Sequence, residues 1–344
     1  MKKRTAAVAI FLVFCISSAI IIALPPHENE ETLYAISENG EKQFIKWVSF
    51  NVSYKALCQA YEIDLKSYGK DIHINFIDLL AYAACKNGGN FSEKTNPNIT
   101  DLAQRLEKGE KLEDITAEMK YFDYYKEAYT AVLGGFVGEY QTEVDAENGD
   151  KKLELRYGIK AFLPIAAGYS FVHSSDFGVS RSYGFKRRHE GNDLFASTAT
   201  PVVCVESGTA EELGWNRYGG WRIGIRSFDK KRYYYYAHLQ KGHPYVSWIS
   251  EGQTVNAGEV IGYVGMTGYS TKEDYNGMKK PHLHFGMQLI FDESQKDSAA
   301  QIWIDVYNII NFLEKNRSVV FKNPETGEFE KKYKVFPAPG TYTE

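Results

Sequence analysis

The stretch Lys280-Pro-His-Leu-His-Phe-Gly286 places two histidines two positions apart inside an apolar run. Residues i and i+2 of a β-strand face the same side of the sheet. We therefore predict that His282 and His284 project into one pocket, while Leu283 and Phe285 pack on the opposite face. Two buried imidazoles side by side are costly unless a metal ion or a reaction uses them. A pair of solvated strand histidines is the alternative reading of this stretch.

Two clusters upstream carry the same types of side chain. His189 and Asp193 flank Gly191, which allows a tight bend, and His238 ends an apolar run that is typical of a strand. Zinc accepts imidazole nitrogens and carboxylate oxygens, and a catalytic zinc site uses three protein ligands plus water. Together the clusters predict a zinc site inside one β-rich domain.

Residues 180–290 resemble the lysostaphin-type zinc endopeptidases, also called the LytM or Gly-Gly endopeptidase family. The resemblance rests on four stretches: His189 to Asp193, Ala237-His238-Leu239, Gly252-Gln-Thr-Val255-Asn-Ala-Gly258-Glu-Val-Ile261-Gly262 and Pro281-His-Leu-His-Phe285. The loop Thr267 to Thr271 also matches, and Lys272 to Lys280 is an insertion relative to the family pattern. The insertion is expected to reshape one wall of the substrate groove.

The resemblance implies one zinc ion (Zn²⁺) per chain, held by His189, Asp193 and His284. It assigns His238 and His282 as catalytic histidines that lie close to the metal without binding it. Free imidazoles titrate near neutral pH and suit the two proton transfers of peptide hydrolysis. Tyr183, six residues before His189, is a candidate hydrogen-bond donor to the oxyanion, with a packed aromatic side chain as the equal alternative.

The net charge and the cysteine content restrict the expected partners and cross-links of the chain. The chain has 344 residues and a formal net charge of −4, so nucleic acid is not an expected partner. The four cysteines are Cys15, Cys58, Cys85 and Cys204, and no two of them form a C-x-x-C pair. Buried free thiols are expected, with pairing of Cys58 and Cys85 as the alternative in an oxidising compartment.

The N-terminal segment predicts a membrane anchor. Met1-Lys-Lys-Arg4 precedes an uncharged run from Thr5 to Leu24, close to the roughly 20 residues that span a bilayer. The run ends in a poor cleavage site, so we expect residues 1–24 to stay uncleaved in the cell membrane as a single pass, with the bulk of the chain extracytoplasmic. Secretion after signal cleavage is the alternative.

Residues 25–43 read as a linker and residues 44–140 as a small all-helical domain. Apolar positions follow a helical period from Trp47 to Tyr61 and from Ile72 to Cys85, which predicts two helices. A third helix is predicted to begin at Thr100, and a fourth to run from Asp114 to Val132. This region holds no catalytic constellation. A spacer is one expectation for it, and docking to envelope proteins is the other.

Residues 150–316 read as the peptidase domain. Short strands with turn signals and no helical crossovers predict a mainly antiparallel sheet, and the resemblance implies a lysostaphin-type, duplicated-hybrid-motif-like fold. Ala299 to Lys315 predicts a late amphipathic helix, and residues 317–344 a partly disordered C-terminal tail. The fold class is therefore α+β: a membrane helix, a helical domain and the β-sheet peptidase domain.

These observations predict a zinc-dependent metalloendopeptidase that hydrolyses peptide bonds in peptidoglycan cross-links or stem peptides, with the substrate implied by the resemblance. The leading alternative is a non-catalytic wall-binding or sporulation-channel scaffold with a peptidase-like domain. Such scaffolds often lack a ligand or a catalytic histidine, whereas all five positions are present here. A lipoyl- or biotinyl-type carrier is a second alternative, suggested by the Gly/Val run. No lysine sits in a Met-Lys turn on that run, and the histidines would go unexplained.

Overall fold

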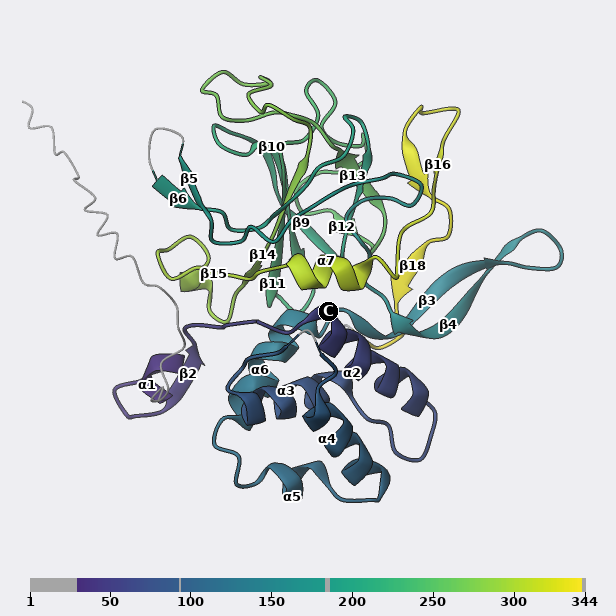
Figure 1. The fold of residues 1–344 in the computed structure, drawn as a ribbon. Helices are drawn as coiled ribbons and strands as arrows, with labels where there is room; N and C mark the ends of the chain where they lie inside the picture. The colour runs from purple at the N-terminus through teal and green to yellow at the C-terminus, as the bar shows by residue number, and fades with distance from the viewer. Residues whose placement is uncertain (1–29, 93, 183–185, 342–344) are drawn as a thin grey trace, which may run out of the picture.

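A computed structural model describes residues 30–92, 94–182 and 186–341. A layer of helices from the N-terminal part of the chain packs against a β-rich body from the C-terminal part (Figure 1). The predicted anchor, Thr5 to Leu24, lies outside the described residues. Among the residues that are described, no helix is long and apolar enough to cross a membrane.

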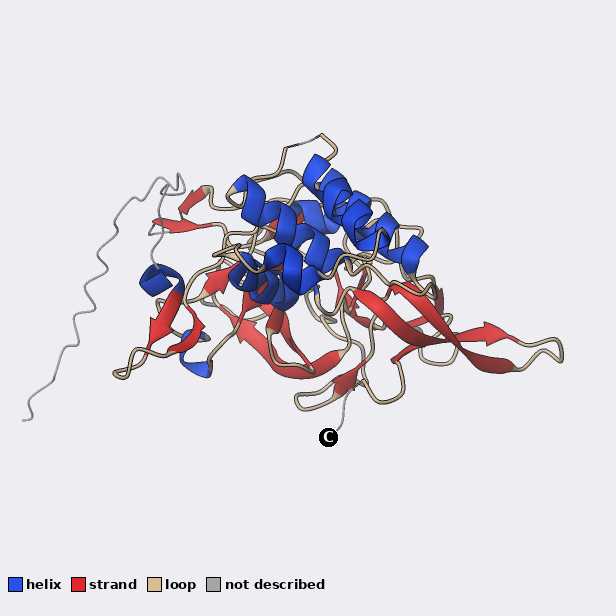
Figure 2. Ribbon diagram, turned by 90° about the horizontal axis from the view of Figure 1, so that it is seen from below, coloured by secondary structure: helices blue, strands red, loops and turns tan. Residues whose placement is uncertain are grey.

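The helical part is built on four main helices. After α1 (Glu30–Leu33) and the hairpin β1 (Tyr34–Ile36) and β2 (Lys42–Ile45), the chain forms α2 (Tyr54–Ser67), α3 (Phe76–Asn87), α4 (Pro97–Glu107), α5 (Leu112–Thr116) and α6 (Phe122–Leu133). The side chains of Ser53, Asn75 and Asn96 cap the N-termini of α2, α3 and α4. Apolar residues bury α3 between α2, α4 and α6, and the helices gather into one layer (Figure 2).

Several helix boundaries differ from the predicted ones. The first helix begins at Tyr54, because Lys42–Ile45 forms β2 and Ser53 supplies the cap. The third begins at Pro97, since Asn96 caps it and proline is preorganised for the first helical position. The predicted helix from Asp114 to Val132 is wrong as a single element. The chain turns after Thr116, and this reversal lets α6 pack on α3.

The β-rich region is organised on a seven-stranded antiparallel sheet, which confirms the predicted pairing. Its strands are β7 (Asn192–Leu194), β9 (Gly208–Asn216), β10 (Gly220–Ser227), β11 (Arg232–Ala237), β12 (Thr254–Val255), β14 (Leu283–Leu289) and β15 (Ile302–Trp303). The order is β12-β9-β10-β11-β14-β15, and β7 also pairs with β14. The strand that carries His284 therefore lies next to the strand that carries Asp193.

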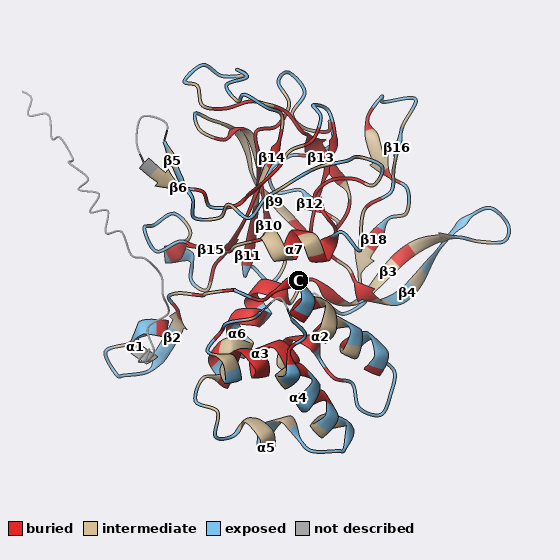
Figure 3. Cartoon of the chain, in the orientation of Figure 1, coloured by how far each residue is buried: buried red, intermediate tan, exposed pale blue. Residues whose placement is uncertain are grey.

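Smaller sheets flank this one. β8 (Pro201–Val203) pairs with β13 (Val260–Tyr263), β5 (Ser180–Ser182) pairs with β6 (Lys186–Arg188), and β3 (Val137–Asp145) pairs with β4 (Lys151–Ile159) in a long projecting hairpin. Buried residues follow the central sheet and the inner faces of α3 and α6, whereas the hairpin tip is exposed (Figure 3).

Two predictions for the C-terminal part are wrong. Ala299 to Lys315 is not one helix: Ile302–Trp303 adds β15 to the open edge of β14, and only α7 (Tyr307–Leu313) is helical. The tail is ordered through Thr341, with β16 (Val320–Lys322), β17 (Phe329–Lys331) and β18 (Val335–Pro337). β18 pairs with β3, so a strand partner distant in sequence orders a segment that local composition made look disordered.

A buried ion pair joins the two parts of the molecule. The Arg232 guanidinium binds both carboxylate oxygens of Glu206, at 2.7 and 3.0 Å. It also donates to the carbonyl of Ala131 in the last turn of α6, at 2.7 Å. Arg232 is 1% exposed. The helical layer is thus tied to the sheet by a charge that has no access to water.

Candidate metal centre and active site

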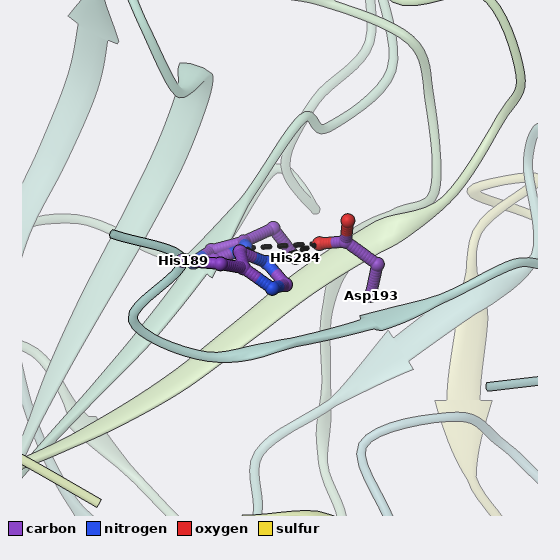
Figure 4. A group of neighbouring side chains, drawn as sticks. All are labelled: His189, Asp193 and His284. Carbon is purple, nitrogen blue, oxygen red and sulfur yellow. Dashed lines mark hydrogen bonds and ion pairs between the residues drawn. The ribbon is translucent and has the colours of Figure 1, made fainter. Parts of the chain in front are cut away.

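Three side chains from two neighbouring strands and the loop before them converge on one point. His284 on β14 lies directly opposite Asp193 on β7, and His189 precedes β7 by a short loop. His189 Nε2, His284 Nδ1 and Asp193 Oδ1 lie 3.0 Å from one another (Figure 4). Ligand atoms in tetrahedral zinc sites lie roughly 3.3 Å apart at zinc–nitrogen bonds of about 2.0 Å. The cluster therefore has the size and donor types of a three-ligand zinc site.

Gly191 is required by close approach rather than by a bend. A Cβ atom at this position would lie 2.6 Å from the Phe285 carbonyl oxygen and 2.7 Å from Cε1 of His284. No real Cβ contact is that short, so only glycine lets the loop pass over the His284 ring. The sequence analysis attributed Gly191 to a tight bend, whereas the structure attributes it to the space that the His284 ring occupies.

The protonation states suit a cation. Burial raises the pKa of Asp193, but hydrogen bonds from His189 and His284 outweigh it and hold the pKa well below its usual range. Burial lowers the pKa of His284, with partial compensation by Asp193. An ionised carboxylate next to a neutral imidazole is the form in which both residues bind metal.

An outer layer of polar groups, missed by the sequence analysis, orients these ligands. Asp176 Oδ1 lies 3.2 Å from His189 Nδ1, on the ring nitrogen that faces away from the cluster. Arg181 Nη2 donates to Asp176 Oδ2 at 2.5 Å and to Asp193 Oδ2 at 3.1 Å. Such partners fix the tautomer and the ring orientation of metal-bound histidines. Asp176 lies 13 positions before His189, a separation that no local pattern marks.

His238 and His282 form a second pair beside the cluster. Their ring centroids lie 4.8 Å apart, and His282 Nε2 lies 3.9 Å from Asp193 Oδ1. His238 Nδ1 bonds to the Thr267 carbonyl at 2.8 Å, and His282 Nδ1 to the Lys280 carbonyl at 2.9 Å. Because a carbonyl accepts, each Nδ1 carries the proton and each Nε2 is left with a free lone pair.

The surroundings of His282 and His238 constrain both rings. Among the described residues, His282 Nε2 is buried and has no hydrogen-bond partner. Burial, followed by the neighbouring His282 and His284, holds the pKa of His238 well below its usual value. His238 also has a φ of 61°, an uncommon conformation for a residue other than glycine. Such outliers persist where the surrounding structure holds them and cluster at functional sites.

The remaining histidines in the described part of the chain have structural contacts. His173 bonds to the side chains of Asn192 and Asn311, and so supports the strand that carries Asp193. His73 bonds to Asp64, and His243 stacks on Tyr263. Tyr183 and His27 lie outside the described residues, as does Cys15. Cys58, Cys85 and Cys204 are free thiols, as expected, but only Cys204 is buried, and Cys58 and Cys85 are half-buried.

Two residues of the metal cluster, His189 and His284, line a cleft. A hollow of about 720 Å³ lies between the segment Trp47 to Asn51 and the residues around His189. A second hollow of about 280 Å³ lies over the sheet next to His284. Both are lined by Arg188 and Trp303, so they adjoin. One wall of the cleft therefore comes from the part of the chain that the sequence analysis left without a functional role.

The insertion Lys272 to Lys280 is held against the sheet domain. Asp274 Oδ1 accepts hydrogen bonds from Trp221 Nε1 at 2.9 Å and from the Gly242 amide at 2.8 Å. Asn276 lines a small hollow with Met266. The insertion is therefore a fixed surface that borders the loop before His282.

Known proteins share this architecture. A solved structure from Ruminococcus gnavus, described as a glycyl-glycine endopeptidase lytM, superimposes with a TM-score of 0.50 over 79% of this chain and 91% of that one, at 24% identity. At this identity the likeness concerns the fold alone: a mainly antiparallel β-sheet domain with a small helical region.

Sequence relatives match the region of the site. The L-Ala–D-Glu endopeptidase of Bacillus subtilis is 45% identical over 125 residues, which cover 36% of each chain. Lysostaphin of Staphylococcus simulans is 40% identical over 98 residues, or 28% of this chain and 17% of that one. The chain thus spans about a third or less of the length of these relatives.

The region that aligns with known proteins contains the cluster. Residues 187–297 match the family described as Peptidase family M23. This range includes His189, Asp193, His238, His282 and His284, whose side chains lie together. Residues 187–297 of this chain are a peptidase family M23 domain.

Proposed function

We propose that the chain is a zinc-dependent endopeptidase that hydrolyses peptide bonds in peptidoglycan cross-links or stem peptides. The observation that carries the proposal is the convergence of five side chains at the cleft: the three donor atoms of His189, Asp193 and His284, and the paired rings of His238 and His282. The three donors hold one zinc ion per chain. Zinc, when bound, supplies Lewis-acid chemistry for the hydrolysis of an amide bond.

His238 and His282 perform the proton transfers. Each ring presents an unprotonated Nε2, because its Nδ1 donates to a backbone carbonyl. A neutral imidazole in this state accepts a proton from the attacking water and returns one to the leaving amine. Burial lowers the pKa of His238, so this ring is neutral near pH 7 and its Nε2 is available to accept a proton.

The names of the relatives support the substrate. One is an L-Ala–D-Glu endopeptidase and another a glycyl-glycine endopeptidase, so peptides of the bacterial wall are the expected substrate class. The cleft accommodates an extended peptide because it continues from the helical layer past His189 to the face of the sheet. We propose that the wall formed by Trp47 to Asn51 gives the helical part a role in holding this peptide.

We further propose that the N-terminal segment places the enzyme at the cell surface. The run Thr5 to Leu24 follows three basic residues, which favours a single-pass anchor with residues 25–344 outside the cytoplasm. The full-length chain should stay with membranes through a carbonate wash and keep its own N-terminus. A mature protein that begins near Pro25 would establish secretion after cleavage instead.

Zinc content and wall digestion, measured together, test the proposed function. Elemental analysis should find about one zinc per chain. His189→Ala, Asp193→Ala and His284→Ala should lose both zinc and activity. His238→Ala and His282→Ala should keep zinc but release peptidoglycan fragments roughly 10²–10⁴-fold more slowly, the usual contribution of a positioned acid or base. Mass spectrometry of the fragments identifies the bond.

A matched control and a contrary result complete this test. His243 stacks on Tyr263 away from the cluster, so His243→Ala should retain both zinc and activity. If the wild-type chain binds zinc and peptidoglycan but releases no fragments, the non-catalytic scaffold replaces the enzyme. Full activity in His238→Ala and His282→Ala would refute the assigned proton transfers.

A further inference from the structure

We propose that Arg187 binds a carboxylate of the substrate next to the scissile bond, so that the cleft selects peptides with an acidic residue at this position. The inference rests on the proposed function and specifies its substrate. It is carried by the position of Arg187 opposite another arginine and by the absence of a carboxylate partner for it among the described residues.

The hairpin at the mouth of the site sets two like charges against each other. β5 and β6 pair so that Arg181 lies directly opposite Arg187, and like charges in this position destabilise a sheet. Arg181 is neutralised by Asp176 at 2.5 Å and by the ligand Asp193 at 3.1 Å. Within the described part of the chain, no ion pair joins Arg187 to a carboxylate, and Asp193 and Glu190 act on its charge only from a distance.

The side chain of Arg187 reaches into the active site. Its guanidinium lies 5.0 Å from the ring centroid of Tyr269, and Tyr269 stacks on His238. Arg187 also lines the hollow of about 280 Å³ that contains the ligand His284 and Tyr235. The guanidinium therefore lies near both the predicted base and the metal cluster.

Burial makes an anionic partner favourable. Among the described residues, Arg187 Nε is buried and has no hydrogen-bond partner, which leaves a desolvated donor unsatisfied. Two other cations that line the same hollow are already paired, Arg222 with Glu212 and Lys296 with Glu211. Glu190, Glu212 and Asp297 also line this hollow, but among the described residues none of them forms an ion pair with Arg187. A peptide anion that enters the hollow would thus meet Arg187 as a cation without a direct carboxylate partner.

Carboxylate is the anion that fits a peptide substrate. The planar guanidinium fork binds a carboxylate through two parallel hydrogen bonds, and an acidic residue beside the scissile bond presents that group. A bridge made of glycine alone presents no side-chain carboxylate. The geometry thus favours an acidic stem peptide, as in the name of the 45% identical relative, over an oligoglycine bridge.

Two peptides that differ in one functional group test the proposal. We would assay the zinc-loaded full-length chain on a peptide with glutamic acid beside the scissile bond and on the same peptide with glutamine there. Wild type should cleave the glutamic acid peptide with the higher kcat/KM. Arg187→Met should lower kcat/KM for that peptide about 10- to 100-fold, mostly through KM, because it removes a charge-assisted contact. It should leave the glutamine peptide nearly unchanged.

Controls separate this role from others. Arg187→Lys should recover part of the loss, and zinc content should match wild type in both variants. Arg156→Gln removes an exposed arginine on β4 that pairs with Glu154 and should change neither peptide. An equal loss on both peptides would assign Arg187 to the oxyanion and overturn the carboxylate proposal, as would loss of zinc.

The same experiments distinguish a failure of the proposed endopeptidase function from a failure of the inference about Arg187. If wild type cleaves neither peptide and releases nothing from peptidoglycan, the endopeptidase proposal itself fails. If wild type digests peptidoglycan but cleaves the glutamine peptide as well as the glutamic acid peptide, only the inference about Arg187 fails. Wild-type preference for the acid that survives Arg187→Met would also overturn it.

Discussion

Replacing Arg232 with methionine should strongly destabilise the chain. The side chains of Arg232 and Glu206 are 1% and 5% exposed. The guanidinium makes two hydrogen bonds to Glu206, one to Asp229 and one each to the carbonyls of Thr130 and Ala131. After Arg232→Met, Glu206 keeps the hydroxyl of Tyr234 at 2.6 Å but loses its cation. Breaking a buried pair from one side costs about 3–5 kcal/mol, because an uncompensated charge stays behind.

Urea unfolding followed by circular dichroism and by tryptophan fluorescence measures this cost. Arg232→Met should lower the free energy of unfolding by about 3–5 kcal/mol, whereas the double variant Arg232→Met/Glu206→Gln should recover most of it, because no buried charge is left unpaired. Gly135→Ala tests the same contact from the helical side, since its Cβ would lie 1.9 Å from Glu206 Oε1. A loss below about 1 kcal/mol in Arg232→Met would refute the view that this pair holds the two parts together.

Three further predictions follow from single contacts. Gly191→Ala should abolish zinc binding, because the new Cβ would lie 2.7 Å from Cε1 of His284; a variant that binds zinc normally would contradict this steric argument. Asp176→Asn should weaken zinc affinity about 10- to 100-fold, as measured in competition with a chelator, because Asp176 is the outer hydrogen-bond partner of the ligand His189. Unchanged affinity would show that Asp176 does not support the zinc ligand. Burial lowers the pKa of Lys331 to about 7 in the folded chain. Between pH 7 and about 10 the unfolded chain therefore holds a proton that the folded chain has released. The free energy of unfolding should thus rise with pH across that window. Lys331→Met should abolish this rise and stabilise the chain at pH 7, as read from urea unfolding at several pH values, whereas an unchanged pH profile would mean that the lysine is not desolvated.

Local signals in the sequence predicted much of the secondary structure. The helical period that was predicted to end at Cys85 ends in the structure at Asn87, where Gly88 takes the left-handed conformation. The start of α4 was missed because the cap lies at Asn96, before the apolar period begins. β15 and β18 could not be read from composition, since each is short and is ordered by pairing with a distant strand, β14 and β3 respectively.

The sequence by itself determined the side chains of the site. The two-residue repeat of a strand makes His282 and His284 face one pocket, with Leu283 and Phe285 fully buried behind them. The donor types and their family pattern then indicated zinc with His189 and Asp193. All of this depends on local geometry and on chemistry that each residue carries alone.

Only the tertiary structure decided what surrounds those side chains. The carboxylate of Asp176 behind His189, the opposition of Arg181 and Arg187, and the cleft wall from Trp47 to Asn51 depend on segments that fold together from separate parts of the chain. No periodicity or spacing encodes such contacts, because strand register and domain packing are set by the sum of many burial and hydrogen-bonding terms. The sequence therefore specifies which atoms are available for chemistry, and the fold specifies how they are oriented, desolvated and reached by a substrate.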